Sequence, residues 1–139
     1  MKRNLLILIS LIAFLNTARA DTIDFWHVYY NKIKLGEYGQ NTKGAIALKI
    51  KNIKKSDSLT IKYFRDTPCI DCETIIAVED KKRTLITKGK GRGTLNPLKI
   101  SVYKLLKYYL QGNKGVYDVY YQEEQSKRLL LFTIEFYYL

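Results

Sequence analysis

Residues 116–138 read VYDVYYQEEQSKRLLLFTIEFYY and carry the clearest structural signal in the chain. Apolar or aromatic side chains recur at every second position on both sides of a polar turn at residues 125–127. This period of two is typical of β-strands, because successive side chains point to opposite faces of a sheet. The stretch predicts an antiparallel hairpin of strands 116–122 and 129–138. One face of the first strand consists of Tyr117, Val119 and Tyr121, and one face of the second consists of Leu130, Phe132, Ile134 and Phe136.

The same alternation recurs upstream in short segments that are rich in β-branched and aromatic residues and are separated by polar, glycine or proline turns. These segments are residues 24–30, 45–53, 59–63, 74–78, 84–87 and 98–102. Seven or eight short strands, with turn signals about every ten residues, favour an all-β fold, an antiparallel β-sandwich.

One segment departs from this period. Apolar residues between 102 and 110 fall at helical spacing, with Ser101 as a cap and Gly112 as a terminator, so we expect one short helix over residues 102–111. This helical turn, the glycine and the strand Tyr117-Asp118-Val119-Tyr120 resemble the connection into the penultimate strand of immunoglobulin-like domains. The resemblance covers residues 101–138 and implies an immunoglobulin-like sandwich in which Tyr117 bonds back to the preceding loop. It implies no function, since this architecture hosts many.

The N-terminal residues indicate export. Lys2 and Arg3 precede an apolar run from Leu5 to Leu15, and Ala18-Arg19-Ala20 places small residues at a cleavage position. This order is typical of a secretory signal peptide, and the run is shorter than the roughly 20 apolar residues of a membrane-spanning helix. We expect cleavage after Ala20 (signal peptide 1–20), a single mature domain over residues 21–139 without a transmembrane segment, and a periplasmic or extracellular location.

The mature chain is basic. The sequence has 24 Lys and Arg against 13 Asp and Glu, and removal of Lys2, Arg3 and Arg19 leaves 21 basic residues and a net charge of +8. A basic protein favours anionic partners, although lysines also keep a tyrosine-rich surface soluble. Because an exported protein meets little nucleic acid, we expect a protein, an anionic glycan or the envelope surface as the partner, and no nucleic acid.

The two cysteines of the chain, Cys69 and Cys72, lie in Pro68-Cys69-Ile70-Asp71-Cys72. In an exported protein such a pair forms a structural disulfide, a thiol-redox pair or part of a metal site. A redox pair favours a helix N-terminus, whereas the residues after Cys72 are strand-like and acidic, and zinc needs two further ligands. We predict a disulfide that pins a loop between two strands, and we expect no cofactor and no metal.

Two features suggest a binding surface. Lys88 to Gly93 reads KGKGRG, which is typical of a flexible loop, so Lys88, Lys90 and Arg92 are candidates for contacting anions. Aromatic doublets recur through the strands, and each directs one ring inward and one outward. Outward rings beside lysines dock proteins or sugars. The candidate aromatic members of the surface are Trp26, Tyr30 and Tyr120.

No catalytic frame is visible in the sequence. The single histidine, His27, follows Trp26 in an aromatic strand and is interpreted as a structural residue, and neither a G-x-S-x-G elbow nor a P-loop is present. We expect no catalytic residues and a small, exported, non-enzymatic module that binds a protein or a glycan. The alternatives are a thiol-redox or metal-handling periplasmic protein that uses Cys69 and Cys72, and a small secreted inhibitor or immunity-type protein.

Overall fold

The computed structural model describes residues 24–42, 44–124 and 126–138. The expected signal peptide lies outside these residues, so cleavage and export stay predictions. The described residues form nine β-strands, a short 3-10 helix and one α-helix: β1 (Phe25–Tyr30), β2 (Ile33–Gly39), β3 (Gly44–Lys49), η1 (Ile50–Asn52), β4 (Ser58–Phe64), β5 (Glu73–Glu79), β6 (Leu85–Arg92), β7 (Leu98–Ser101), α2 (Val102–Leu110), β8 (Tyr117–Glu123) and β9 (Leu129–Tyr137). Neither of these helices has the length and hydropathy that crossing a membrane requires.

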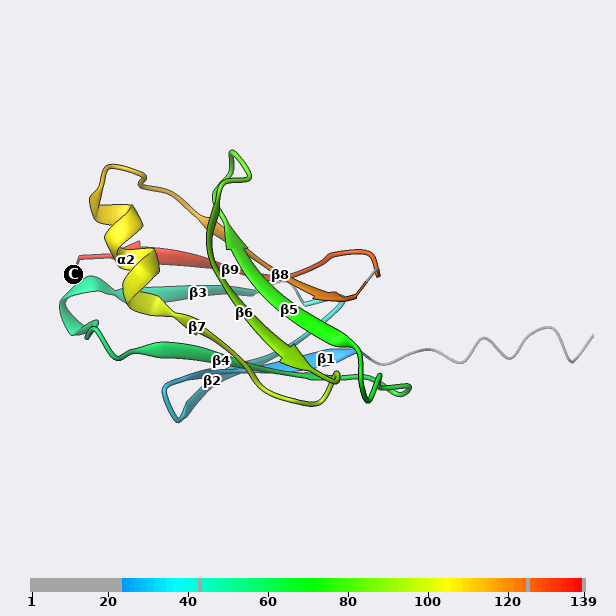
Figure 1. Cartoon of the computed structure of the whole chain (residues 1–139). Helices are drawn as coiled ribbons and strands as arrows, with labels where there is room; N and C mark the ends of the chain where they lie inside the picture. The colour runs from blue at the N-terminus through cyan, green and yellow to red at the C-terminus, as the bar shows by residue number, and fades with distance from the viewer. Residues whose placement is uncertain (1–23, 43, 125, 139) are drawn as a thin grey trace, which may run out of the picture.

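The strands form two sheets, with the orders β2-β1-β4-β7 and β3-β9-β8-β5-β6 (Figure 1). The prediction of a mostly β chain is confirmed. Seven or eight strands are too few, because the glycine-interrupted segment Ile33–Gly39 pairs with β1 as an edge strand. The expectation of purely antiparallel pairing is wrong at one place, where β3 runs parallel to β9. These two strands are far apart in the sequence, so no tight hairpin forces them to be antiparallel.

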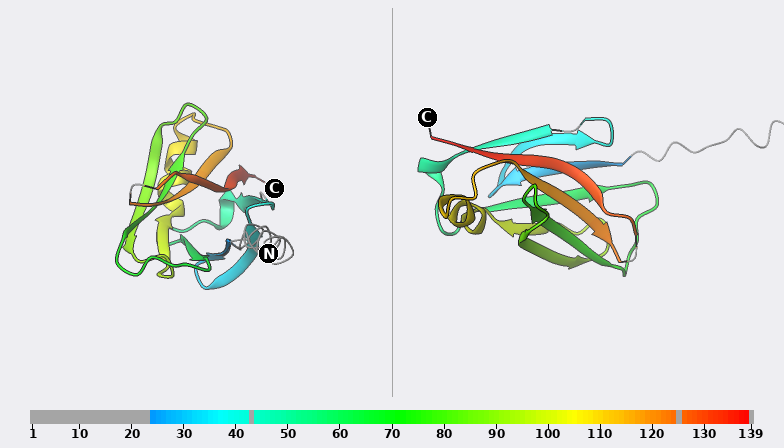
Figure 2. Two further views of the ribbon diagram at one scale, coloured as in Figure 1. Left: turned by 90° about the vertical axis from the view of Figure 1, so that its right-hand side faces the viewer. Right: turned by 90° about the horizontal axis from the view of Figure 1, so that it is seen from above.

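One hydrophobic core lies between the sheets. Tyr63 on β4 stacks on Tyr121 on β8, with ring centroids 4.3 Å apart, and Tyr38 on β2 packs against Phe132 on β9 at 6.0 Å. Both contacts join a strand of one sheet to a strand of the other. Figure 2 shows the two layers from two further directions, with α2 at one end of the molecule.

The KGKGRG stretch is mostly strand, and the prediction of a flexible loop is wrong. It belongs to β6, which pairs antiparallel with β5, and its three basic side chains are exposed. A Cβ at Gly89 would lie 2.2 Å from the Lys99 carbonyl oxygen, and one at Gly91 would lie 2.6 Å from the Leu98 side chain. The two glycines therefore allow β7 of the other sheet to approach β6 closely.

The helix forms where the sequence predicts it. The Ser101 hydroxyl caps α2 by accepting a hydrogen bond from the Lys104 backbone N–H at 3.3 Å. The apolar face of the helix is buried and consists of Val102, Leu105, Leu106 and Tyr109. The chain leaves the helix through Gly112 at a φ of 97°, a conformation that favours glycine.

Tyr117 opens β8 shortly after this helix. Its side chain is buried, and its hydroxyl donates a hydrogen bond to the Asn113 carbonyl oxygen at 2.5 Å. Burial above all raises the pKa of Tyr117 to about 12. The hydrogen bond ties the start of β8 to the loop that precedes it.

β8 and β9 form the predicted antiparallel hairpin. The pairing register shifts between Val119 and Tyr120, so Leu131 enters the core and Leu130 stays partly exposed. The prediction that Leu130 shares the face of Phe132 is therefore wrong. An irregularity of this kind adds a residue to one strand and interrupts the strict alternation on which the prediction depends.

Candidate functional site

The predicted binding residues do not form one surface. Trp26 is only 1% exposed and packs in the core, so its interpretation as a surface residue is wrong. Tyr30 donates its hydroxyl hydrogen to the Asp57 carboxylate. Tyr120 belongs to the other sheet, is partly exposed and lies beneath the Arg128 guanidinium, whose carbon is 4.3 Å from the ring centroid.

The basic residues of β6 lie on the β3-β9-β8-β5-β6 sheet, where much of the positive charge is already paired. Three cations of this region lie within ion-pair distance of carboxylates: Lys90–Glu73 at 3.0 Å, Arg92–Asp71 at 3.6 Å and Arg128–Glu79 at 2.7 Å. Exposed pairs of this kind add little stability. They do neutralise these three cations.

The solvent side of the β2-β1-β4-β7 sheet carries four adjacent, partly exposed rings, which we call the aromatic cluster. Phe25, His27 and Tyr29 alternate along β1, and Phe64 lies opposite Phe25 on β4. The Phe25 and Phe64 rings stack with centroids 4.8 Å apart and planes 12° apart. The His27 ring lies 4.9 Å from Phe64 and 6.3 Å from Tyr29. The cluster is a continuous patch that spans two strands.

Charged side chains surround the aromatic cluster. His27 Nε2 lies 2.9 Å from Glu37 Oε2, and the Tyr29 hydroxyl lies 3.5 Å from His27 Nδ1, so both ring nitrogens have partners. Lys62 Nζ lies over the Tyr29 ring, 5.4 Å from its centroid. A hydrogen bond from Lys34 lowers the pKa of the exposed Glu37 carboxyl. The patch therefore has an apolar centre and a polar rim.

Phe25, and not Trp26, is the outward ring of the first aromatic doublet. Alternation over residues 25–29 separates Trp26 and Val28 from the other three residues but does not say which set is buried. The position of His27 was the available signal, because its polar ring shares a face with the two flanking aromatic residues and marks that face as the outer one. Phe64 gives no signal by itself, since only the pairing of β4 with β1 brings it to the cluster.

Cys69 and Cys72 lie at disulfide distance in the loop between β4 and β5, and strand β5 follows them directly. This loop is bound to the loop between β6 and β7. The Thr94 backbone N–H donates to the Cys69 carbonyl oxygen at 2.8 Å, and the Cys69 N–H donates to the Thr94 hydroxyl at 2.8 Å. We call residues 65–72 and 93–97, together with Glu123, the loop end of the molecule.

Glu123 connects the parts of the loop end. It is only 9% exposed, and its carboxylate accepts hydrogen bonds from Arg65 at 2.8 Å, from the Thr94 hydroxyl at 2.7 Å and from the Tyr121 hydroxyl at 3.0 Å. Burial raises the pKa of Tyr121, and the negative charge of Glu123 adds to that effect. Because Thr94 also holds Cys69, one buried carboxylate links the core to the disulfide loop.

A pocket of about 360 Å³ opens beside Glu123, between the ends of β4 and β8 and the start of β9. Asp24 also lines it and accepts a hydrogen bond from Gln40 at 2.7 Å. Two of its cations, Arg65 and Arg128, are already bound to carboxylates. Across the part of the chain that the structure describes, no group of three or more His, Cys, Asp or Glu side chains is placed to hold a metal ion.

The aromatic cluster and the loop end are two of the places where side chains from distant parts of the sequence meet. The first is partly exposed and largely apolar, and the second consists mostly of exposed loop residues that are bonded to the buried Thr94 and Glu123 side chains. Comparison of the chain with protein-family models and with curated proteins finds no match. The function has to be argued from these side chains themselves.

Proposed function

We propose that this chain is an exported, non-enzymatic binding domain with an immunoglobulin-like sandwich fold, and that it binds a protein partner through the aromatic cluster. The two sheets, the helix between β7 and β8, and the hydrogen bond from Tyr117 to the loop before β8 support the fold. A tyrosine in this place, bonded back to the backbone, is a hallmark of immunoglobulin-like domains.

The aromatic cluster is the observation that carries the proposed activity. When a partner covers partly exposed rings on a sheet face, the removal of apolar surface from water lowers the free energy of the complex. Aromatic residues are enriched among the interface residues that contribute most to binding. Isolated exposed rings need no explanation, but contiguous apolar patches mark interaction sites. The polar rim formed by Glu37 and Lys62 matches the anatomy of a protein interface.

The ring geometry favours a protein over a glycan. A sugar stacks on an open ring face, whereas Phe25 and Phe64 cover each other and Lys62 covers a face of Tyr29. One face of each of these three rings is therefore already covered by another side chain. Grooves between partly covered rings suit the interdigitating side chains of a protein interface.

A capture experiment with matched variants tests this proposal. The bait is the mature chain, compared with Phe25→Ser/Phe64→Ser and with the control Ile75→Ser/Tyr120→Ser, which changes two partly exposed residues of the other sheet. Thermal unfolding establishes that all three are folded. We expect wild type and control to recover one stoichiometric protein complex from the cell envelope or medium, and the cluster variant to lose it.

Three results would overturn the assignment. The cluster variant could retain the complex, the control could lose it equally, or wild type could recover none. A glycan that binds wild type and is lost with the same cluster variant would reassign the surface to a glycan.

A further inference from the structure

Exposed lysines gather at the end of the molecule opposite the loop end. They lie in the β1–β2 turn, in the segment from η1 to β4, and in the first turn of α2. All five are exposed, and no carboxylate of the described residues forms an ion pair with them. We call this set the basic end; it consists of Lys32, Lys51, Lys54, Lys55 and Lys104.

Asp57 holds the three lysine-bearing segments together. Its carboxylate accepts hydrogen bonds from the Asn31 side-chain amide at 3.1 Å and from the Lys54 backbone N–H at 2.8 Å. Its carbonyl oxygen accepts from the Val102 N–H, the first residue of α2, at 3.1 Å. The side chain is buried, so this carboxylate is bonded inward. The lysines are therefore brought together by a fixed scaffold while their ammonium groups face solvent.

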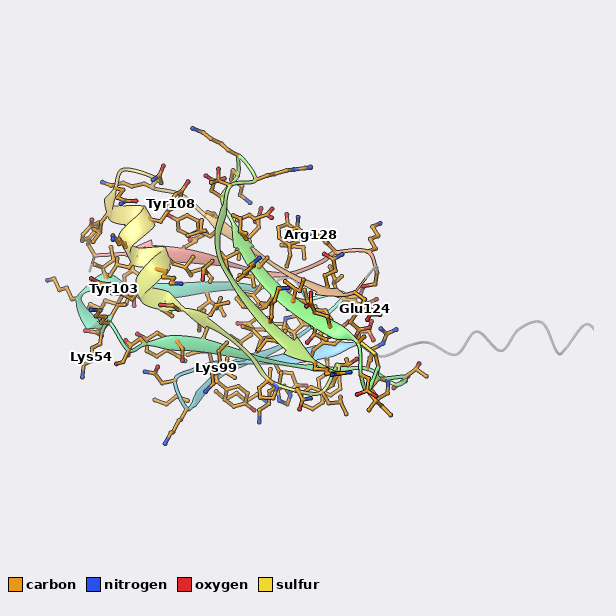
Figure 3. All side chains as sticks on the ribbon, viewed as in Figure 1. Lys54, Lys99, Tyr103, Tyr108, Glu124 and Arg128 are labelled. Carbon is orange, nitrogen blue, oxygen red and sulfur yellow. A yellow bond between two sulfur atoms is a disulfide. The ribbon has the colours of Figure 1, made fainter. Side chains whose placement is uncertain are left out.

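Exposed apolar side chains stand among these lysines. Ile33 is 71% exposed and follows Lys32, and Tyr103 is 38% exposed and precedes Lys104. Figure 3 shows Lys54 and Tyr103 at one end of the molecule and Glu124 at the other. Positive charge and exposed apolar surface thus coincide.

The loop end has the opposite character. Its cation Arg65 is paired with Glu123, and the adjoining Arg92 of β6 is paired with Asp71, so both positive charges are neutralised. Positive charge without a carboxylate partner therefore distinguishes the basic end from the loop end. Such an asymmetry orients a protein over an anionic surface before contact.

We propose that the basic end docks the protein on an anionic lipid surface, with the lysines at the headgroups and Ile33 and Tyr103 entering the interfacial layer. Lysines near a negatively charged leaflet attract it, and apolar side chains between them gain by leaving water. A soluble polyanion offers the same charges but no apolar layer for Ile33, which is why the lipid surface is favoured. This proposal goes beyond the partner proposed for the aromatic cluster and uses a different surface.

Vesicle co-sedimentation tests the proposal. The protein is mixed with vesicles of phosphatidylglycerol and phosphatidylcholine in equal parts, and separately with pure phosphatidylcholine vesicles. Since each lysine near such a surface contributes about fivefold to the partition coefficient, Lys54→Gln/Lys55→Gln is expected to lower it about 25-fold. Ile33→Ser is expected to lower it about tenfold, because the side chain no longer enters the interfacial layer. The control Lys82→Gln/Lys127→Gln removes the same charge from exposed lysines elsewhere and is expected to change binding only slightly.

The outcomes separate the alternatives. Binding that requires phosphatidylglycerol and follows this order of variants supports the proposal. It is overturned by no binding to the anionic vesicles, by equal losses in Lys54→Gln/Lys55→Gln and the control, or by an unchanged Ile33→Ser variant. The basic end would be assigned to a soluble polyanion if Lys54→Gln/Lys55→Gln lowered heparin binding by the expected factor but left vesicle binding unchanged. None of these variants alters the aromatic cluster, so the result is independent of the capture experiment.

Discussion

Each end of β4 lies beside one buried carboxylate, and the two carboxylates are satisfied in different ways. Asp57, just before the strand, accepts hydrogen bonds from uncharged donors: the Tyr30 hydroxyl, the Asn31 amide and a backbone N–H. Glu123 lies beside Arg65, just after the strand, and binds its guanidinium at 2.8 Å.

This difference accounts for the character of the two ends. At the loop end, the charge of Glu123 is cancelled by a cation that the fold itself supplies, so the bonding is directed inward. At the basic end, neutral donors satisfy Asp57, and the lysines around it remain available to solvent. A buried carboxylate organises both places, but only the basic end carries net positive charge for contacts outside the molecule.

The largest effect is expected from Glu123→Ala. The change leaves Arg65, the Thr94 hydroxyl and the Tyr121 hydroxyl without their acceptor in a mostly buried place, so it should lower the free energy of unfolding by about 3–4 kcal/mol. Urea unfolding measures this. The matched variant Glu123→Gln retains an acceptor oxygen and should cost clearly less; equal costs would mean that the hydrogen bonds from the two hydroxyls contribute nothing.

Asp57→Ala is the corresponding change at the basic end. It removes the acceptor of three uncharged donors, and we expect a loss of about 2–3 kcal/mol in the free energy of unfolding. No cation loses a direct partner, which is why the effect should be smaller than at Glu123. A loss larger than that of Glu123→Ala would contradict the distinction between the two ends.

The contribution of Asp57 also has a defined pH dependence. The Lys54 backbone N–H and, after it, the Tyr30 hydroxyl hold the pKa of the Asp57 carboxyl below its ordinary value of 3.8. A carboxyl with a lowered pKa in the folded state stabilises the fold above the ordinary pKa, and this stability is lost as the pH falls through the lowered value. The difference in unfolding midpoint between wild type and Asp57→Ala should therefore be full at neutral pH and shrink in strong acid. A difference that stays constant would show that ionisation of Asp57 is irrelevant.

The sequence does not show that Asp57 and Glu123 each bond to residues from distant segments of the chain. The strands and α2 follow from local periods of two and of about 3.6 residues, and these periods are visible within a few positions. Asn31 and Asp57 are 26 residues apart, and Arg65 and Glu123 are 58 apart, and only the packing of the sheets makes them neighbours. The same limit applies to Phe64 in the aromatic cluster.

The glycines of β6 illustrate a second limit. The sequence alone predicts flexibility at Gly89 and Gly91, because glycine permits many backbone conformations. In the structure, the two glycines are needed because they have no Cβ: β7 lies against them and leaves no room for a side chain. Composition alone does not distinguish these two uses of glycine, since the neighbour that decides between them comes from the other sheet.

Removal of the disulfide tests how much it stabilises the protein and whether the loop end takes part in binding. Changing Cys69 and Cys72 together to alanine releases a loop of about four residues, which should lower the free energy of unfolding by about 2 kcal/mol. Binding at the aromatic cluster should be unaffected, since no residue of the cluster belongs to the loop end. Thermal unfolding and the capture experiment measure the two properties. Unchanged stability together with lost binding would move the binding site to the loop end.

The smallest effect is expected at Gly112, which follows α2. An added Cβ there would meet nothing within 4 Å, so Gly112→Ala should cost only the strain of a positive φ, about 1 kcal/mol. Gly93 also has a positive φ, but its added Cβ would lie 2.5 Å from the Ile70 carbonyl oxygen. Gly93→Ala should therefore cost at least twice as much, because the two loops it joins cannot separate without breaking the hydrogen bonds between Thr94 and Cys69. Urea unfolding measures the loss in the free energy of unfolding for Gly112→Ala and Gly93→Ala. Equal losses would show that the backbone of the loop end adjusts to an added Cβ as easily as the chain after α2.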